Sequence, residues 1–217
     1  MTFWTFLIVG TLLMVGVMLI ARLPYRIPVW KTVIAAVLLT FAGYAGAKLM
    51  AFIEAGNWSG RSFYGALFFA PVLMVPVAWL LRIRAGDLLD MCAPAECVML
   101  AMLKVNCALD GCCYGYLIRI DEQGNLVRFP SQIVECVTAL LLMLVLLWMT
   151  RKEKFHGSIY PWYMLLYGVL RFGLNLLRET EPFIWGLPAG NFWSLISAGI
   201  GLALLLIHRR QMKAEKV

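Results

Sequence analysis

Long apolar runs separated by short polar stretches divide the chain. Seven of them approach the length of about 20 residues that a helix needs to cross the hydrocarbon core of a bilayer. They cover residues about 3–21, 32–52, 62–81, 91–109, 131–150, 158–177 and 187–207. No connection is long enough to separate two domains, and no internal repeat is visible. The pattern therefore predicts an all-α integral membrane protein, a single domain over residues 1–217, folded as a seven-transmembrane-helix bundle.

The sixth run differs from the others because polar side chains recur along it at intervals of three or four residues. These positions are Tyr160, Tyr163, Tyr167, Arg171, Asn175 and Arg178. In a helix such spacing places them on one face. Arg171 is expected about two turns below the surface, where a guanidinium must face protein or water rather than lipid. The run therefore predicts a helix whose polar face lines the interior of the bundle.

Composition agrees with a membrane protein, and the distribution of charge orients it. Mean hydropathy is +0.82 and only 14% of the residues are charged, which excludes an ordinary soluble domain. Basic residues gather in alternate connections and at the C-terminal end, and such positions are normally cytoplasmic. They are Arg22, Arg26, Lys31, Arg82, Arg84, Arg151, Lys152, Lys154, Arg209, Arg210, Lys213 and Lys216. The N-terminus is therefore expected outside and the C-terminus in the cytoplasm. This bias and attraction to anionic lipid explain the net charge of +7, so no nucleic-acid partner is expected.

Polar groups at the outer ends of several runs are predicted to gather at one depth. The densest stretch is KVNCALDGCCYG, residues 104–115, at the end of the fourth run. A charge in hydrocarbon is expensive and marks a candidate functional site. The converging residues are Lys48, Tyr64, Lys104, Asp110, Gln132, Glu135, Arg171, Asn175 and Arg178. Because lysine and arginine dominate the deep positions, the group predicts a pocket for an anionic phosphate, such as a phospholipid headgroup entering from the outer leaflet.

Two residues of this region keep alternative interpretations. Lys48 fits an amine that extends to the membrane interface as well as it fits a site residue. Tyr64 also fits a simple interfacial aromatic. The loop that follows the fourth run is polar, with a hairpin turn expected at Gly124 and Asn125, and it is placed to cover the pocket.

Six cysteines lie in or beside the apolar runs. They are Cys92, Cys97, Cys107, Cys112, Cys113 and Cys136. This placement differs from a secreted disulfide framework. Zinc sites usually contain imidazole or four thiolates, and both histidines fall on the predicted cytoplasmic side, so neither a metal ion nor another cofactor is expected. Most of the cysteines are interpreted as small packing residues, and a redox role for Cys112 and Cys113 stays open.

Five stretches, in this order along the chain, resemble motifs of the bacterial prolipoprotein diacylglyceryl transferase family. They are GRSFYGAL at 60–67, AGDLLDMCAP at 85–94, KVNCALDGCCYG at 104–115, RFPSQIVE at 128–135 and YGVLRFGLNLLR at 167–178. The resemblance covers most of the chain. It implies the fold of that family and a place in the inner membrane of a bacterial cell.

The resemblance also implies a reaction. The family transfers a diacylglyceryl group from phosphatidylglycerol to the lipobox cysteine of a prolipoprotein and releases glycerol phosphate at the outer face of the membrane. By analogy, Lys104 and Arg171 would stabilise the leaving phosphate, Glu135 and Gln132 would orient these cations or the glycerol, and Tyr167 would support Arg171. The implied catalytic residues are Lys104, Arg171, Tyr64 and Glu135. The implied substrate-binding residues are Lys48, Asp110, Gly115, Gln132, Tyr167, Asn175 and Arg178.

The chain departs from the family pattern at several motif positions. Tyr64 stands where the family has a histidine, Lys104 replaces an arginine, Cys107 an asparagine, Phe129 a histidine and Asn175 a glutamate. A second hypothesis is therefore a catalytically altered relative that binds phospholipid, assists assembly or uses a different acceptor. A transporter is disfavoured because the polar groups are confined to the outer half of the bundle.

Overall fold

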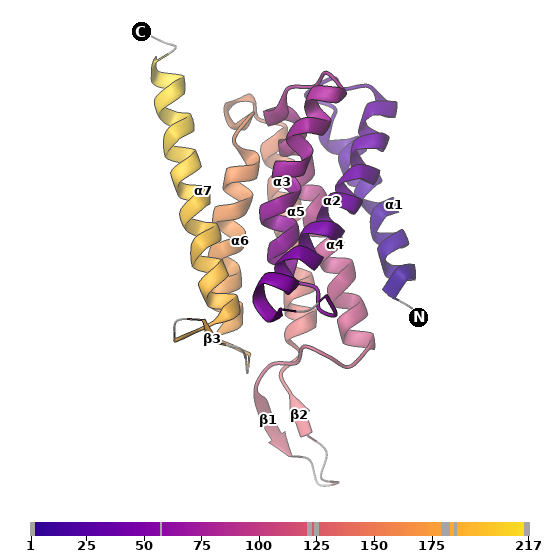
Figure 1. Cartoon of the computed structure of the whole chain (residues 1–217), viewed down its shortest axis with the longest axis vertical. Coiled ribbons are helices and arrows are strands. Elements are labelled where there is room, and N and C mark those ends of the chain that lie inside the picture. Colours follow the sequence, from indigo (N-terminus) through magenta and orange to yellow (C-terminus); the bar gives the residue numbers. More distant parts are fainter. Residues whose placement is uncertain are drawn as a thin grey trace.

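This computed structural model describes residues 3–56, 58–120, 123, 126–178, 183–184 and 186–214. Within them the chain forms seven α-helices, one 3-10 helix and two small β-hairpins (Figure 1). The α-helices are α1 (Phe3–Ala21), α2 (Val29–Ala55), α3 (Phe63–Leu80), α4 (Ala85–Leu109), α5 (Ser131–Thr150), α6 (Ile159–Asn175) and α7 (Ala189–Ala214). The other elements are η1 (Glu153–Phe155), β1 (Leu117–Ile120), β2 (Leu126–Arg128), β3 (Phe183–Ile184) and β4 (Leu187–Pro188).

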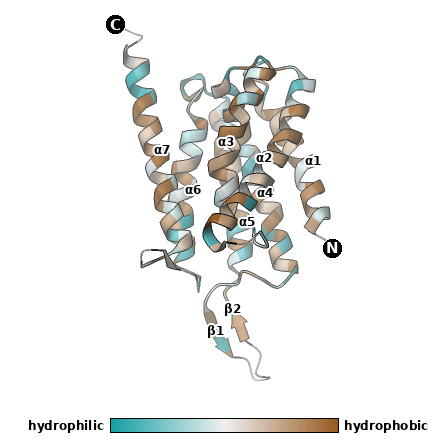
Figure 2. Ribbon diagram, viewed as in Figure 1, coloured by the Kyte–Doolittle hydropathy of each residue, from teal (hydrophilic) through white to brown (hydrophobic). Residues whose placement is uncertain are grey.

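Five helices are long and apolar enough to cross a membrane: α1, α2, α3, α5 and the Ala189–Met212 part of α7. Large apolar side chains on these helices are exposed, with Leu12 66% and Trp79 83% exposed, as lipid contact requires. Figure 2 shows hydrophobic residues, in brown, along much of these helices. The expectation of an all-α membrane protein is thereby confirmed. The remaining long helices, α4 and α6, supply most of the polar groups described below.

Helix α4 is the central element of the bundle. It packs against α1, α3, α5 and α6, and more than half of its 25 residues are buried. The helices alternate in direction, so that the first described residues and the β1–β2 hairpin lie at one end and the C-terminal end of α7 lies at the other (Figure 1). A residue near the C-terminal end of α4 therefore lies at the same end as the hairpin.

The sequence placed the start of α4 too late. The fourth apolar run begins at about 91, whereas α4 begins at Ala85. Asp87 does lie in the first turn, where acidic side chains are favourable. Asp90, however, is only 1% exposed. A hydropathy profile places the boundary of the apolar run at Asp90 because it takes no account of the hydrogen bonds that allow this carboxylate to be buried.

Those hydrogen bonds join three segments at the end of the bundle opposite the hairpin. The Asp90 carboxylate accepts the Tyr25 hydroxyl at 2.9 Å and the backbone N–H groups of Gly157 at 2.6 Å and Ile159 at 2.8 Å. Ile159 is the first residue of α6, so its N–H has no partner within that helix. Asp90 thus fixes the start of α6 and the α1–α2 connection against α4.

Close backbone contacts bring α2 to α3 and α6 to α7. A Cβ atom at Gly46 would overlap the Gly65 carbonyl group, and one at Gly65 would overlap the Gly46 carbonyl group. In the other pair, a Cβ at Gly168 would lie 2.6 Å from the Ser194 carbonyl oxygen. Small residues at these crossings let the helix backbones touch, as is common in membrane bundles.

The loop after α4 forms a two-stranded hairpin. Strands β1 and β2 pair antiparallel, with Ile120 opposite Leu126. The predicted turn at 124 and 125 lies outside the described residues. The hairpin extends beyond the helices (Figure 1), and none of its described strand residues lines the main cavity, so the position expected for a cover is not observed.

Candidate functional site

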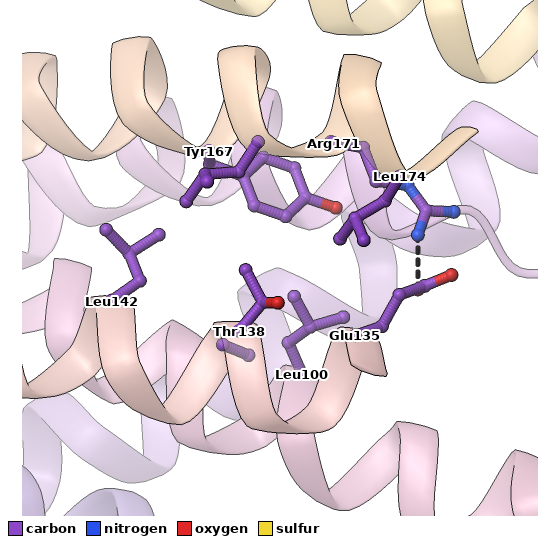
Figure 3. A pocket seen from close by; sticks show the side chains of 9 residues that line it. Leu100, Glu135, Thr138, Leu142, Tyr167, Arg171 and Leu174 are labelled. Atoms are coloured by element: carbon purple, nitrogen blue, oxygen red, sulfur yellow. Dashed lines mark ion pairs between the residues drawn. The ribbon is translucent and has the colours of Figure 1, made fainter. Parts of the chain in front are cut away.

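Three cationic side chains converge on one carboxylate. The Lys104 Nζ atom lies 2.5 Å from Glu135 Oε2, and the Arg171 guanidinium pairs with the same oxygen. The Arg178 Nη1 atom lies 3.1 Å from the other oxygen, Oε1. Figure 3 shows Arg171 extending from α6 toward Glu135 on α5. The cluster, hereafter the cation cluster, joins α4, α5 and the segment from α6 to Arg178.

Its charge is unbalanced in a largely dry position. The Glu135 side chain is 3% exposed, and the three cations are between 12% and 14% exposed. Within the described part of the chain, one paired carboxylate offsets one of the three positive charges. Because buried charge is costly unless it is paired, the cluster favours an additional anion. A phosphate, which accepts bidentate hydrogen bonds from arginine, meets this requirement.

The cluster borders a cavity of about 550 Å³. Six predicted site residues line it: Tyr64, Lys104, Asp110, Tyr167, Arg171 and Arg178. Apolar side chains from α1 and α2, including Leu7, Met14 and Leu39, form another part of the wall. A cavity with a cationic region and an apolar wall suits an anionic amphiphile.

A second, small pocket of about 20 Å³ opens between α5 and α6 (Figure 3). Its walls are mainly apolar, with Leu142, Thr138 and Leu174 around it. It shares Tyr167 and Arg171 with the large cavity. The polar face of α6 therefore borders space on two sides, and its predicted inward orientation is confirmed by the burial of Tyr160, Tyr163, Tyr167 and Asn175.

Tyr64 lies on the cavity wall with its hydroxyl engaged by α7. The hydroxyl donates to the Gly190 carbonyl oxygen at 2.8 Å and lies 2.6 Å from Ser194 Oγ. Asn175 is buried against the same glycine, because a Cβ at Gly190 would lie 2.5 Å from Asn175 Nδ2. Tyr64 and Asn175 therefore hold the start of α7 against α3 and α6.

Two other predicted residues position the loop after α4. Gln132 donates to the Cys112 carbonyl oxygen from the first turn of α5, and Ser131 Oγ donates to the Cys113 carbonyl oxygen at 2.7 Å. Gly115 hydrogen-bonds to the Phe129 carbonyl oxygen at 2.8 Å, and a Cβ there would meet the Leu177 carbonyl oxygen. Ser131 and Gln132 thus hold Cys113 and Cys112, which line the cavity.

The remaining two predicted residues lie in different surroundings. Asp110 caps α4, lines the cavity and accepts the Asn106 side-chain amide at 2.7 Å. Lys48 lies apart from the cation cluster, since its Nζ donates to the Trp58 carbonyl oxygen at 2.6 Å. Lys48 does not line the cavity in the described part of the chain.

The sequence did not predict that Cys107, Cys112 and Cys113 form a cluster on the cavity wall. Their sulfur atoms all lie within 4.8 Å of one another. A hydrogen bond with the Cys107 thiol, with the charges of Lys104 and Arg178, lowers the pKa of Cys113 to about 5, whereas burial raises the pKa of Cys112. The sequence signal for this cluster was the short spacing between Cys107, in the predicted helix, and the adjacent pair Cys112 and Cys113. Their closeness in space, however, depends on backbone turns that composition does not encode.

Glu54, Arg61 and Ser62 were also missed. They line the cavity from the end of α2 and the loop before α3, and Ser62 Oγ donates to Glu54 at 3.2 Å. The Arg61 guanidinium lies over the Phe3 ring, 3.7 Å from its centre. Their location at the predicted outer ends of neighbouring apolar runs was the sequence signal that could have identified them as cavity residues.

Fold and site together define a multi-helix membrane protein with a cation-lined cavity open to an amphiphilic ligand. A sequence model of the prolipoprotein diacylglyceryl transferase family matches residues 3–207. The chain therefore belongs to this transferase family, as its five motifs indicated. Membership confirms the predicted resemblance and places the chain among proteins of lipoprotein biosynthesis.

Individual relatives carry the same family name. The phosphatidylglycerol–prolipoprotein diacylglyceryl transferase of Dehalococcoides mccartyi is 23% identical over 212 residues, covering 87% of this chain and 82% of the relative. That of Geobacter sulfurreducens is 30% identical over 165 residues, covering 70% and 63%. A second such enzyme of Clostridium perfringens is 25% identical over 205 residues, covering 90% and 75%.

Proposed function

We propose that this protein is a phospholipid-dependent transferase that moves a diacylglyceryl group from phosphatidylglycerol to an acceptor thiol, the lipobox cysteine of a prolipoprotein. The observation that carries the proposal is the cation cluster. It presents three positive charges and one negative charge on the wall of a cavity that also has an apolar side. The two remaining positive charges match a phosphate that carries one negative charge as a diester and gains a second as glycerol phosphate leaves. The apolar wall matches acyl chains.

In the proposed reaction, the acceptor thiolate attacks the glyceryl CH₂ carbon that bears the phosphate. A carbon–sulfur bond forms while the carbon–oxygen bond breaks, and its electron pair leaves on the phosphate oxygen of glycerol phosphate. The proton of the acceptor thiol passes to water. Lys104 and Arg171 stabilise the charge that develops on the leaving phosphate, which is the largest catalytic effect available in this cavity.

The other site residues have supporting roles in this proposal. Glu135 holds the three cations in place, and Arg178 adds charge at the edge of the cluster. Tyr167 lies one turn before Arg171 on α6 and borders the same cavity. Tyr64, Asp110 and Asn175 shape the wall that faces the glycerol end of the lipid.

We further propose that all seven helices span a bacterial inner membrane, with the N-terminus outside. The alternating helix directions and the basic residues at the end opposite the hairpin support this orientation. The cation cluster then lies in the outer half of the bilayer, where a phospholipid of the outer leaflet can enter sideways. Its acceptor would approach from the extracytoplasmic side.

The decisive experiment follows glycerol phosphate release by mass spectrometry. Purified protein receives labelled phosphatidylglycerol with a lipobox peptide, and a parallel sample receives a peptide whose cysteine is replaced by serine. Release that requires the cysteine, and that Lys104→Ala and Arg171→Ala reduce at least about 100-fold, is expected for loss of transition-state charge stabilisation. Arg210→Ala, at the far end of α7, is the matched control and should leave release unchanged.

The second candidate function is a catalytically altered relative that binds phospholipid, assists assembly or uses another acceptor. One observation favours it: the Tyr64 hydroxyl, at the family's histidine position, is already engaged by Gly190 and Ser194. Under this alternative the protein binds phosphatidylglycerol, Arg171→Ala abolishes the binding, and no glycerol phosphate is released. Release without peptide would instead indicate another acceptor.

A further inference from the structure

Three of the six cysteines form a compact group at the end of α4, hereafter the thiol cluster. Cys107 lies in the last turn of the helix, and Cys112 and Cys113 lie in the loop that follows. Their sulfur atoms lie within 4.8 Å of one another, and all three residues line the same cavity as the cation cluster. Cys92, Cys97 and Cys136 belong to helices α4 and α5 and are not part of the group.

The loop is held in a conformation that gathers the thiols. Gly111 has φ +66° and Cys113 has φ +61°, so two of three successive residues adopt the left-handed region. A non-glycine residue rarely adopts positive φ, and Cys113 does so because neighbouring bonds hold it there. The Cys112 N–H bonds to the Cys107 carbonyl oxygen at 3.0 Å, while Ser131 and Gln132 bind the carbonyl groups of Cys113 and Cys112.

We propose that Cys107, Cys112 and Cys113 bind a thiophilic metal ion, with Zn²⁺ as the reference case, on the wall of the cavity. Tetrahedral Zn²⁺ has Zn–S bonds of about 2.3 Å, which sets its sulfur ligands about 3.8 Å apart. The three sulfur atoms are already within 4.8 Å of one another, so small rotations of the side chains complete the site. The four-residue gap between Cys107 and Cys112 is also usual for zinc ligands.

Charge at the site supports the same conclusion. Three thiolates around a divalent ion leave one net negative charge, which would be costly beside apolar helices. Lys104 and Arg178 line the same cavity as the three cysteines, so their positive charges are placed to offset that charge. The two basic residues are thus shared by the cation cluster and the thiol cluster.

A site with three protein ligands leaves the fourth position of Zn²⁺ open, the arrangement of catalytic rather than structural zinc sites. Because all three cysteines line the cavity, that position borders it. The chemistry that fits is an acceptor thiol, which would bind as a thiolate after its proton passes to water. This role rests on the proposed function: the ion would hold the attacking sulfur in the cavity where the cation cluster holds the phosphate.

The first test measures binding of the metal alone. Protein reduced and freed of metal by a chelator is titrated with Zn²⁺, and Co²⁺ is used as a spectroscopic substitute. We expect one ion per chain and an intense sulfur-to-Co²⁺ charge-transfer band in the native protein. Cys107→Ser and Cys113→Ser should both lose the ion and the band, whereas the matched control Cys136→Ser should keep them.

Folding of the variants is checked by their thermal unfolding midpoint without metal, which should stay near that of the native chain because the thiols lie at a helix end and a loop. Zn²⁺ should raise the midpoint of the native protein and of Cys136→Ser only. Absence of stoichiometric binding, equal loss in Cys136→Ser, or a disulfide within the cluster as the resting state of freshly isolated protein would each overturn the proposal.

The second test examines the open position. A lipobox peptide should change the Co²⁺ spectrum, and the same peptide with serine in place of cysteine should not; identical spectra would overturn the open position. The metal proposal and the proposed function can fail independently of each other. Zinc binding without any transfer would refute the transferase alone, and transfer undiminished after chelation would refute the metal role alone.

Discussion

Glu135 holds three cationic side chains at one point of the cavity wall. It can do so because it lies one turn inside α5, on the same face as Gln132, where α4 and α6 both approach. The carboxylate is not an ordinary salt-bridge partner, since it compensates only part of the charge around it. Its role is to keep like charges together until an anionic ligand supplies the rest.

Replacement of Glu135 by glutamine should therefore destabilise the free protein more than it harms ligand binding. Three largely buried cations would lose the carboxylate with which all of them pair, at a cost of about 3–5 kcal/mol. Unfolding in mixed micelles measures the loss, and inorganic phosphate should restore more stability to the variant than to the native chain. Glu153→Gln, in exposed η1, is the control and should change stability little. Equal stability of both variants would contradict the role assigned to Glu135.

Individual residues were predicted correctly where helical periodicity determines the face of the helix on which a side chain lies. Arg171 and Tyr167 follow the polar stripe of α6, and Lys104 lies two turns from Glu96 on α4. Both α4 residues pair with other helices, Glu96 with Tyr160 at 3.0 Å and Lys104 with Glu135. Lys48 could not be placed from periodicity because a long flexible amine takes whichever carbonyl group lies nearest. The thiol cluster was missed because loop dihedral angles, not spacing, bring it together.

At the scale of elements, the bounds of α1 and α5 agree with their apolar runs, whereas α4 does not. The difference lies in Asp90, whose burial depends on three donors from segments distant in sequence. Helix ends that rely on tertiary hydrogen bonds are invisible to hydropathy. The same donors explain why α4 can carry a carboxylate deep among apolar neighbours.

Asp90→Ala should weaken the connection between α4 and α6. It would leave the N–H groups of Gly157 and Ile159 and the Tyr25 hydroxyl without their acceptor, at a cost on the order of 3 kcal/mol. Asp87→Ala, one turn earlier and without such bonds, should cost no more than about 1 kcal/mol through the helix dipole. Reversible unfolding of both variants in mixed micelles provides the comparison. Similar losses in the two would show that Asp90 contributes only as a helix-start residue.

The α2–α3 crossing offers a packing test with an internal control. Gly65→Ala places a methyl group against the Gly46 carbonyl, so the helices must separate and stability should fall by about 1–3 kcal/mol. Gly16→Ala in α1 meets nothing within 4 Å and should be neutral or slightly stabilising. Because α2 and α3 both border the cavity, phosphatidylglycerol binding should weaken in the first variant alone. Thermal unfolding and lipid binding of the pair decide whether the close crossing shapes the site.

For the whole molecule, hydropathy was sufficient to predict the seven α-helices of the described chain, because a long apolar run in a membrane protein must satisfy its own backbone as a helix. Their alternation then followed from short connections. The cavity was not predictable in this way: its shape depends on side chains from α1, α2, α3 and α4 that no single run reveals. Orientation depends on charge bias alone, and it decides which face of the membrane supplies the substrates.

Labelling with a membrane-impermeant maleimide tests that orientation. Cys112 is exposed at the hairpin end of the bundle, so after removal of any bound metal by a chelator it should react in intact spheroplasts if this end faces outward. A chain with Cys107, Cys112 and Cys113 replaced by serine and carrying Arg210→Cys should react only after permeabilisation, since the basic end of α7 should face the cytoplasm. The same triple-serine chain without the added cysteine is the control for the three remaining cysteines. The reverse pattern would place the cation cluster in the inner leaflet, where an extracytoplasmic acceptor could not reach it, and would remove the transferase proposal together with the topology.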